Sequence, residues 1–298
     1  MKSLRDVNRN FHDPTHFCAN FKNFDGSPVN VMVQMDADEF FNNLLDKLEK
    51  ELKATGSGDA ISRTFGGEIV QEIICKDHDF KSERVNPFLA LPVEVKGNMN
   101  LQQCLDQFIK GELLEGENQY FCDELNQKVD AFKRECIKRL PNVLIIVLKR
   151  FSFNFETMEK LKINDFCKFP DELDMKKYTQ ETLNEELSSE KPHDYYHYKL
   201  RGVLVHKGGA DSGHYYSFIK DHNQKWYEFN DTVVRPFNEN KMAEECYGGF
   251  ENSNNSMGQD TSKGKNAYML FYERKGLYNS SGEKIESLLQ GLNGTITS

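Results

Sequence analysis

The sequence predicts an α+β fold, and three observations along its 298 residues support this prediction. A helical pattern follows residue 36, because apolar side chains recur there at spacings of three and four and so share one face. These side chains are Phe41, Leu44, Leu45, Leu48 and Leu52. Residues 143–151 form a near-continuous apolar run, which is typical of a strand buried on both faces. Over 198–273, short apolar segments alternate with glycine-rich or polar turns, which favours a β-rich region.

The remaining elements of the first half follow from local signals. On the exposed side of the first helix, Asp46–Lys50 and Glu49–Lys53 have the spacing of ion pairs, and a Thr-Gly-Ser-Gly sequence should end the helix. Strands are then expected at 65–75 and 88–95. A helix is expected over 100–109 with Asn100 as its cap, and a hairpin over 118–138.

The second half is predicted to be mostly strands joined by polar segments. The expected strands are 198–206, 214–220, 226–229, 233–237 and 268–273. Residues 172–194 are acidic and lack periodicity, so we expect a loop or insertion there. The Asn/Ser/Gly-rich stretch 250–266 predicts a mobile loop, and a weakly structured tail with one short helix at 283–290 should follow residue 275.

Composition and charge argue against several classes of protein. The chain has 38 basic and 47 acidic residues, a net charge of −9, which argues against nucleic acid as a partner because phosphate binding needs concentrated Lys and Arg. No apolar run approaches the ~20 residues that span a bilayer, and the start lacks the apolar stretch of a secretory signal, so no membrane partner is expected. Seven scattered cysteines, an odd number, favour reduced thiols in the cytoplasm or nucleus.

The segment GADSGHYYSFIKDHNQKWYEFND carries the strongest chemical signal. It places His214 at the start of a predicted strand, where an imidazole can be exposed beside substrate. Asn230 and Asp231 end the next strand, so a hairpin would return them to His214, and one of their oxygens could accept the Nδ1–H of the imidazole and fix its tautomer. This is the histidine half of a Cys–His–Asn/Asp arrangement. A single histidine on a strand is nevertheless more often structural.

Several segments, in order, resemble the boxes of the ubiquitin-specific protease family (peptidase C19), the papain-like cysteine deubiquitinases. They are QMDADEFF at 34–41, LKRF at 148–151 followed by KIN at 162–164, the histidine box at 198–220, WYEFND at 226–231 and NAYMLFY at 266–272. The resemblance covers about residues 25–274. The stretches GELLEGENQYFC and KINDFCKFP resemble the fat-facets-like branch of that family.

The resemblance implies a papain-like fold of the thumb–fingers–palm type. It divides the chain into a partial helical thumb at 1–60, β-rich fingers at 61–140, a β-sheet palm with the histidine box at 141–274 and a tail at 275–298. The thumb is expected to be truncated, because only 33 residues precede the QMDADEFF box.

The resemblance also implies thiol-dependent hydrolysis of bonds after the C-terminal glycine of ubiquitin. His214 would be the general base, Asn230 its orienting residue and Asp231 a second contributor. The implied partners are ubiquitin and ubiquitinated proteins.

A second set of residues is implied to bind ubiquitin. Gln34, Asp36 and Glu39 would contact its arginine-containing C-terminal tail, although capping of the helix N-terminus also explains them. A channel for the two terminal glycines would be lined by Phe151, His206 and Tyr215. Packing in the core is the structural alternative for the two aromatic residues.

The sequence departs from the family where the nucleophile is expected. The family's cysteine box lies upstream of the QMDADEFF box and is missing here, and Cys18 lacks its sequence context. Two interpretations follow. The chain is an incomplete copy of a longer enzyme, which we favour because the histidine box is intact, or it is a catalytically inactive ubiquitin-binding adaptor.

The sequence departs from many relatives at the zinc site of the fingers as well. Cys75 and His78 form one possible ligand pair, but Cys122 lacks a second ligand nearby. A structural zinc takes four ligands, so these residues could hold one only if a remote residue completed the set. We expect no metal and no cofactor.

Overall fold

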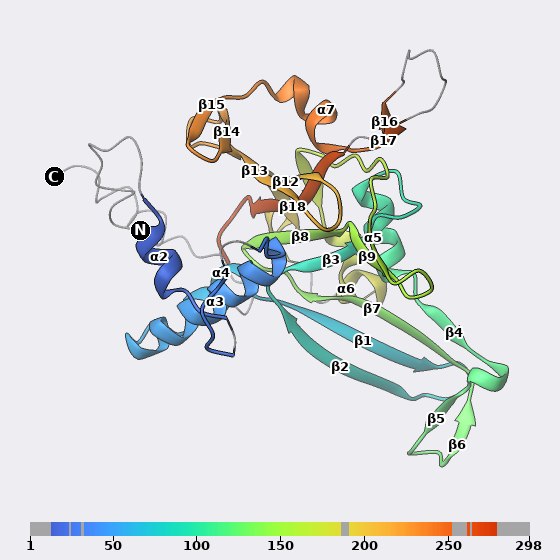
Figure 1. The fold of residues 1–298 in the computed structure, drawn as a ribbon. Helices are drawn as coiled ribbons and strands as arrows, with labels where there is room; N and C mark the ends of the chain where they lie inside the picture. Colours follow the sequence, from blue (N-terminus) through green and yellow to red (C-terminus); the bar gives the residue numbers. More distant parts are fainter. Residues whose placement is uncertain are drawn as a thin grey trace.

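The computed structural model describes residues 13–23, 25–30, 33–185, 191–251, 261–262 and 264–278. Two sheets organise it: an eight-stranded sheet and a four-stranded sheet that extends away from it (Figure 1). The structure describes only parts of the two loops expected at 172–194 and 250–266. Residues 252–260 and the helix expected at 283–290 lie outside the described residues.

The larger sheet is antiparallel except at one edge. Its strand order is β15-β14-β13-β12-β18-β8-β3, with β11 pairing alongside β12, and only the β3–β8 pair is parallel. The strands are β3 (Leu91–Glu94), β8 (Val143–Lys149), β11 (Glu172–Asp174), β12 (His197–Gly208), β13 (Gly213–Lys220), β14 (Trp226–Asn230), β15 (Val233–Pro236) and β18 (Lys265–Arg274). The β-rich region that the sequence predicts is therefore confirmed.

The smaller sheet has the order β2-β1-β7-β4 and continues into a separate hairpin at its far end (Figure 1). Its strands are β1 (Gly67–Cys75), β2 (Lys81–Phe88), β4 (Glu112–Leu114) and β7 (Ala131–Arg139), and the hairpin is β5 (Tyr120–Cys122) with β6 (Gln127–Val129). The hairpin and the strand at 65–75 were expected. Strand β2 was not, because its sequence KSERVNPF is polar, carries a proline and forms an exposed edge.

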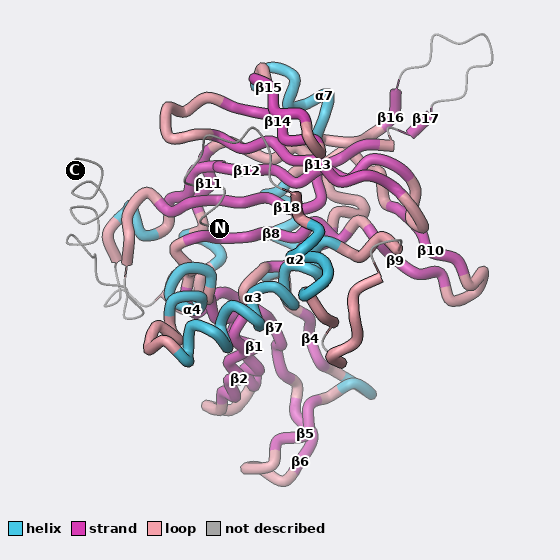
Figure 2. The backbone as a smooth tube through the Cα atoms, turned by 60° about the vertical axis from the view of Figure 1, so that its left-hand side comes forward, coloured by secondary structure: helices cyan, strands magenta, loops and turns pink. Residues whose placement is uncertain are grey.

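Helices cover both faces of β8. On one face, Ile145 and Val147 pack with Phe41 of α3 (Ala37–Ala54) and Phe65 of α4 (Ala60–Phe65), and Figure 2 shows α3 and α4 lying over this part of the sheet. On the other face, the alternate residues of β8 pack with α5 (Leu101–Ile109), whose cap Asn100 accepts a hydrogen bond from the Gln103 amide. Burial of β8 on both faces is therefore confirmed.

The other elements are short. They are α2 (Thr15–Asn20), η1 (Gly116–Asn118), β9 (Phe151–Asn154), β10 (Glu159–Lys162), η2 (Lys176–Tyr178), α6 (Gln180–Leu183), η4 (His193–Tyr195), η5 (Glu239–Lys241), α7 (Met242–Cys246), β16 (Phe250–Glu251) and β17 (Thr261–Ser262).

The expectation of a loop or insertion at 172–194 is wrong, whereas most of the tail expected after residue 275 lies outside the described residues. Residues 172–185 carry a strand and short helices, and Leu173, Met175 and Tyr178 are buried in the main core. After residue 275, Tyr278 is buried and its amide donates to Asn142. These apolar side chains recur without helical or strand periodicity, so the pattern alone did not reveal their burial.

A buried carboxylate links this irregular segment to the smaller sheet. The side chain of Glu72 on β1 is fully buried, with Lys81 Nζ and Arg134 Nε each 2.6 Å from one of its oxygens. Gln180 Nε2 and Asn184 Nδ2 also donate to it. Burial alone would raise the pKa of Glu72, but hydrogen bonds from Lys81, Gln180 and Arg134 outweigh burial and lower the pKa from 4.5 to about 2.

The lowered pKa of Glu72 predicts a specific loss of stability in acid. The contribution of the carboxylate is complete above pH 4.5 and disappears as the pH falls toward 2, because the folded state then has to accept a proton at an unfavourable site. A shift of this size corresponds to about 3 kcal/mol in the free energy of unfolding. Urea unfolding of wild type and Glu72→Gln between pH 2 and 6 should give a flatter pH dependence for the variant.

Glu112→Gln is the matched control, because Glu112 lies on the same sheet in an exposed pair with Lys133. Exposed pairs contribute little, so its pH dependence should follow wild type. Equal slopes for wild type and Glu72→Gln would contradict the assignment.

Candidate active site

Strand pairing brings His214 and Asn230 to the same face of the larger sheet. Strands β13 and β14 pair antiparallel with Ser217 opposite Phe229 and Phe218 opposite Glu228. Because side chains alternate along a strand, His214 shares a face with Phe218, Glu228 and Asn230. The hairpin that the sequence predicts is therefore confirmed.

The two side chains are in direct contact. His214 Nε2 lies 2.7 Å from Asn230 Oδ1, and the imidazole is about half exposed, with 43% of its side chain accessible. The expectation that Nδ1 makes this contact is wrong, because the rotation of the His214 side chain brings Nε2 to the amide oxygen. No hydrogen bond involves Nδ1 within the described part of the chain, so this nitrogen is available to a reacting group.

Asp231 is near the imidazole but more distant than Asn230. Its Oδ2 lies 3.8 Å from His214 Nε2, and its side chain is 75% exposed. Asp231 is the first residue after β14, and its φ of 52° lies in the left-handed region, so the strand conformation ends before it. Asn230 is therefore the direct partner of His214, and Asp231 supplies negative charge nearby.

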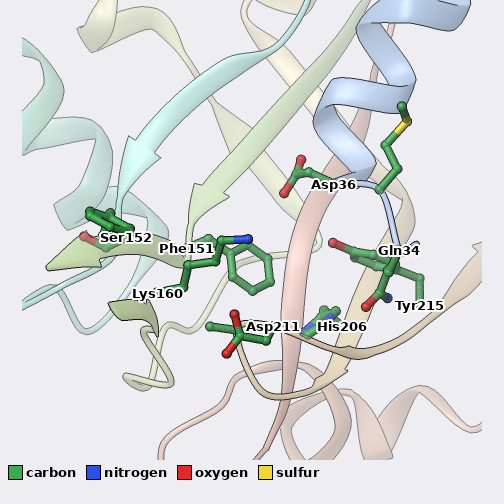
Figure 3. Close-up of a pocket in the computed structure, with 11 residues that line it drawn as sticks. Gln34, Asp36, Phe151, Ser152, Lys160, His206, Asp211 and Tyr215 are labelled. Carbon is green, nitrogen blue, oxygen red and sulfur yellow. The ribbon is translucent and has the colours of Figure 1, made fainter. Parts of the chain in front are cut away.

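A pocket of about 390 Å³ brings together most of the other predicted site residues. Figure 3 shows Phe151 facing the group formed by Gln34, His206 and Tyr215, with Asp36 at the start of α3. The remaining lining residues are Met35, Ser152, Phe153, Lys160, Ala210 and Asp211. Glu39 does not line the pocket. It is exposed in the first turn of α3.

The pocket adjoins His214 through Gly213. The amide of Gly213 donates to Gln34 Oε1 at 2.8 Å, a contact between residues 179 positions apart in sequence. A Cβ at Gly213 would lie 2.3 Å from His206 Nε2 and 2.5 Å from the carbonyl oxygen of Lys207. Only glycine therefore fits at this point, where the pocket meets the strand that carries His214.

The aromatic residues that line the pocket also pack against other side chains of the core. The Phe151 ring packs edge-on against the rings of His206 and Tyr268, with 5.0 and 5.2 Å between the ring centroids. The hydroxyl of Tyr268 donates to Asp36, which also caps α3 by accepting from the amides of Asp38 and Glu39. Asp36 therefore caps the N-terminus of α3, as the alternative explanation expects, and also lines the pocket.

His206 is held in its neutral form. Its side chain is buried, and burial followed by the nearby charge of Lys162 lowers its pKa from 6.5 to about 4. Near neutral pH this wall of the pocket is therefore uncharged, while Asp36 contributes a carboxylate.

Sequence reasoning did not identify Lys162, which lies in the KIN segment. Its Nζ donates to three backbone oxygens, those of His206, Gly208 and Gly264, at 2.9–3.1 Å. Burial, with a further contribution from Arg150, lowers its pKa to about 8. Lys162 thus joins β10 to the end of β12, immediately before the loop that leads to His214. A lone Lys gives no sequence signal for such a role.

The three residues considered as possible zinc ligands differ in their surroundings. Cys75 and Cys122 are buried with Val129 in a small apolar cluster, whereas His78 is exposed. Among the described residues, no group of three or more His, Cys, Asp or Glu side chains is arranged to hold a metal ion. Two thiols by themselves do not supply the four ligands of a structural zinc.

Comparison with known proteins identifies the family. The family model described as "Ubiquitin carboxyl-terminal hydrolase" matches residues 1–272. The chain belongs to this family. Ubiquitin carboxyl-terminal hydrolase 9X of Mus musculus is 38% identical over 297 residues, which cover 89% of this chain and 12% of that protein. Probable ubiquitin carboxyl-terminal hydrolase FAF of Drosophila melanogaster is 37% identical over 273 residues, covering 84% and 10%. The chain thus spans about a tenth of these relatives.

Solved structures of this family share the fold. A chain in the SAGA Ubp8/Sgf11/Sus1/Sgf73 DUB module bound to ubiquitin aldehyde matches with a TM-score of 0.66 and 27% identity, covering 82% of this chain and 50% of that one. The predicted α+β fold of a ubiquitin-specific protease is therefore confirmed. In the described part of the chain, no helix is both long and apolar enough to span a membrane.

The crowding at Gly213 predicts that a single methyl group distorts the site. Gly213→Ala should displace the His206 ring or the adjacent backbone and destabilise the fold by about 1–3 kcal/mol, as overpacking does. Gly209→Ala is the control in the same loop, because the nearest atom to its Cβ is Ser212 O at 3.9 Å. Thermal unfolding and the imidazole NMR signals of His206 report both effects. Equal behaviour of the two variants would contradict the packing at Gly213.

Proposed function

We propose that this chain carries the histidine half and the ubiquitin-tail channel of a thiol-dependent deubiquitinase. The observation that carries the proposal is the 2.7 Å contact between His214 and Asn230, located where the pocket adjoins Gly213. A general base needs an exposed imidazole with a fixed tautomer beside a site for substrate. The half-exposed His214, its contact with Asn230 and its position next to Gly213 support this role.

The geometry suggests how the proton moves. With Nε2–H donated to Asn230, the lone pair of Nδ1 accepts the proton of a thiol. The resulting thiolate attacks the carbonyl carbon of ubiquitin's last glycine, forming a thioester as the lysine amine leaves with a proton from the imidazolium. Water then attacks the thioester, with His214 again accepting a proton, and releases ubiquitin with a free carboxylate.

The pocket suits the end of the ubiquitin tail. Phe151, His206 and Tyr215 present aromatic walls on a pocket of about 390 Å³, against which the extended end of the tail, with its two glycines, would lie. The neutral His206 avoids repelling the arginine of the tail, and the lining offers two carboxylates, Asp36 and Asp211, against one lysine, Lys160. The similarity to a DUB module bound to ubiquitin aldehyde supports ubiquitin as the partner.

The attacking thiol is not assigned to a described cysteine. Burial raises the pKa of Cys75 and Cys246, and it raises that of Cys136 to about 12, so these thiols are poor nucleophiles. Among the seven cysteines, only Cys18 is not buried. The burial of the other six cysteines, together with the missing sequence context of Cys18, favours a second candidate function for this chain, namely ubiquitin binding without hydrolysis.

Both candidate functions predict that this chain binds ubiquitin through its tail. In isothermal titration calorimetry, removal of the last two glycines of ubiquitin should weaken binding at least about tenfold. His214→Ala should bind intact ubiquitin as wild type does, because the imidazole acts on the thiol and not on the tail. Equal affinity for intact and shortened ubiquitin would overturn the proposed channel.

Hydrolysis is tested separately with ubiquitin carrying a C-terminal electrophile that traps thiolates. Labelling of a cysteine that His214→Ala abolishes would support the hydrolase. Binding without labelling would favour the adaptor.

Asp36 allows the charge of the tail site to be separated from helix capping. Asp36→Asn keeps an oxygen for the cap and for Tyr268, so the free energy of unfolding should change by less than about 0.5 kcal/mol. Loss of the charge should weaken ubiquitin binding about fivefold and reduce its salt dependence. Asp36→Ala should also destabilise the fold by about 1–2 kcal/mol. The control Asp46→Asn, on the exposed side of α3, should change neither property, and full binding by Asp36→Asn would contradict the role of the charge.

A further inference from the structure

An ion pair between Glu228 and Arg235 lies next to the His214–Asn230 contact. The Glu228 carboxylate accepts two hydrogen bonds from Arg235, Nε to Oε2 at 2.9 Å and Nη2 to Oε1 at 3.0 Å. Glu228 and Arg235 are opposite each other in the β14–β15 pairing. The Glu228 side chain is 10% exposed, whereas Arg235 covers it from the solvent side and is 64% exposed.

Glu228 also holds the amide of Asn230. Asn230 Nδ2 donates to Glu228 Oε1 at 3.2 Å, while the other end of the same amide, Oδ1, faces His214 Nε2 at 2.7 Å. An ionised carboxylate can only accept hydrogen bonds, so it can hold the NH₂ end of the amide and repels the oxygen end. With the amide reversed, its carbonyl oxygen would face the carboxylate.

The orientation of the amide in turn determines the tautomer of the imidazole. An amide oxygen accepts a hydrogen bond, so Nε2 of His214 has to carry the proton and Nδ1 has to keep its lone pair. A reversed amide would present NH₂ to Nε2 and favour the opposite tautomer, with the proton on Nδ1. That tautomer cannot accept a proton from a thiol at Nδ1.

We propose that Glu228, clamped by Arg235, is a positioning residue that fixes the Asn230 amide and thereby keeps His214 in the Nε2–H tautomer. The catalytic role of this tautomer rests on the proposed function. The effect of Glu228 on the tautomer depends only on residues of this chain. Of the groups around the imidazole, Asp231 lies 3.8 Å from Nε2 and would act on the charge of the ring. Tyr216 stacks on the ring and pairs with Glu245. Within the described residues, only Glu228 contacts the NH₂ end of the Asn230 amide.

The test is ¹⁵N NMR of the imidazole nitrogens in the full chain, recorded at a pH high enough that the spectrum shows the neutral ring. Wild type should show His214 almost entirely as the Nε2–H tautomer. In Glu228→Gln, the side chain can donate as well as accept, so both amide orientations become allowed. The Nδ1–H form should rise from a minor species to roughly equal population.

Glu273→Gln is the matched control, because Glu273 pairs with Arg201 on the same sheet without contacting His214 or Asn230. It should leave the tautomer of His214 unchanged. Arg235→Gln removes the clamp from a mostly exposed position, so it remains informative if Glu228→Gln does not fold, and a smaller rise of the Nδ1–H form is expected.

Two outcomes would overturn the inference. One is a wild-type His214 that is mainly in the Nδ1–H form. The other is an unchanged ratio of the two tautomers in folded Glu228→Gln and Arg235→Gln. No ubiquitin is present in this experiment. Its failure is therefore distinguishable from failure of the proposed function, which the binding of ubiquitin tests.

Discussion

The arrangement depends above all on the antiparallel pairing of β13 with β14. This pairing fixes which face each side chain takes, so His214, Glu228 and Asn230 align on one face within a single hairpin. A shift of the register by one residue would send His214 and Asn230 to opposite faces and separate them. Because β13 also pairs with β12 along seven residues, the register is held from both sides.

The pocket depends on a different kind of constraint, which is contact between distant parts of the sequence. Gln34 precedes α3 and binds the amide of Gly213, and Asp36 accepts a hydrogen bond from Tyr268, 232 residues away. Both contacts come from the few residues that lead into α3. Packing of α3 on Ile145 and Val147 therefore serves two purposes: it buries apolar surface and places the start of the helix against the strand that carries His214.

The sequence predicts those features that follow from local patterns. Helical spacing predicts α3, and its ion pairs Asp46–Lys50 and Glu49–Lys53 are present at 2.7 and 3.4 Å. The contact between His214 and Asn230 is predictable because it lies within one hairpin. The choice of Nε2 over Nδ1 is not, since it depends on strand twist and side-chain rotation, which no periodicity encodes.

Features built from long-range polar contacts are not predictable from pattern. The burial of Glu72 requires donors from β2, β7 and the segment that includes α6, and nothing in the residues around Glu72 distinguishes it from an exposed glutamate. The same holds for Lys162, whose three carbonyl partners come from two other strands or their ends. Glu228 and Arg235 lie close in sequence, but the hydrogen bond from Asn230 to Glu228 can be predicted only once it is known that both side chains are on the same face of β14.

The central claim is that the ubiquitin tail ends beside His214, and a distance measurement tests it most directly. Ubiquitin extended at its C-terminus by one cysteine that carries a nitroxide spin label would be added to the chain. The paramagnetic broadening of the NMR signals would then be compared between histidines of the chain. His222, just beyond the opposite end of β13, is an internal reference. The account predicts strong broadening of His214 with His222 little affected. Equal broadening of both signals, or a sharp His214 signal with ubiquitin bound, would contradict it.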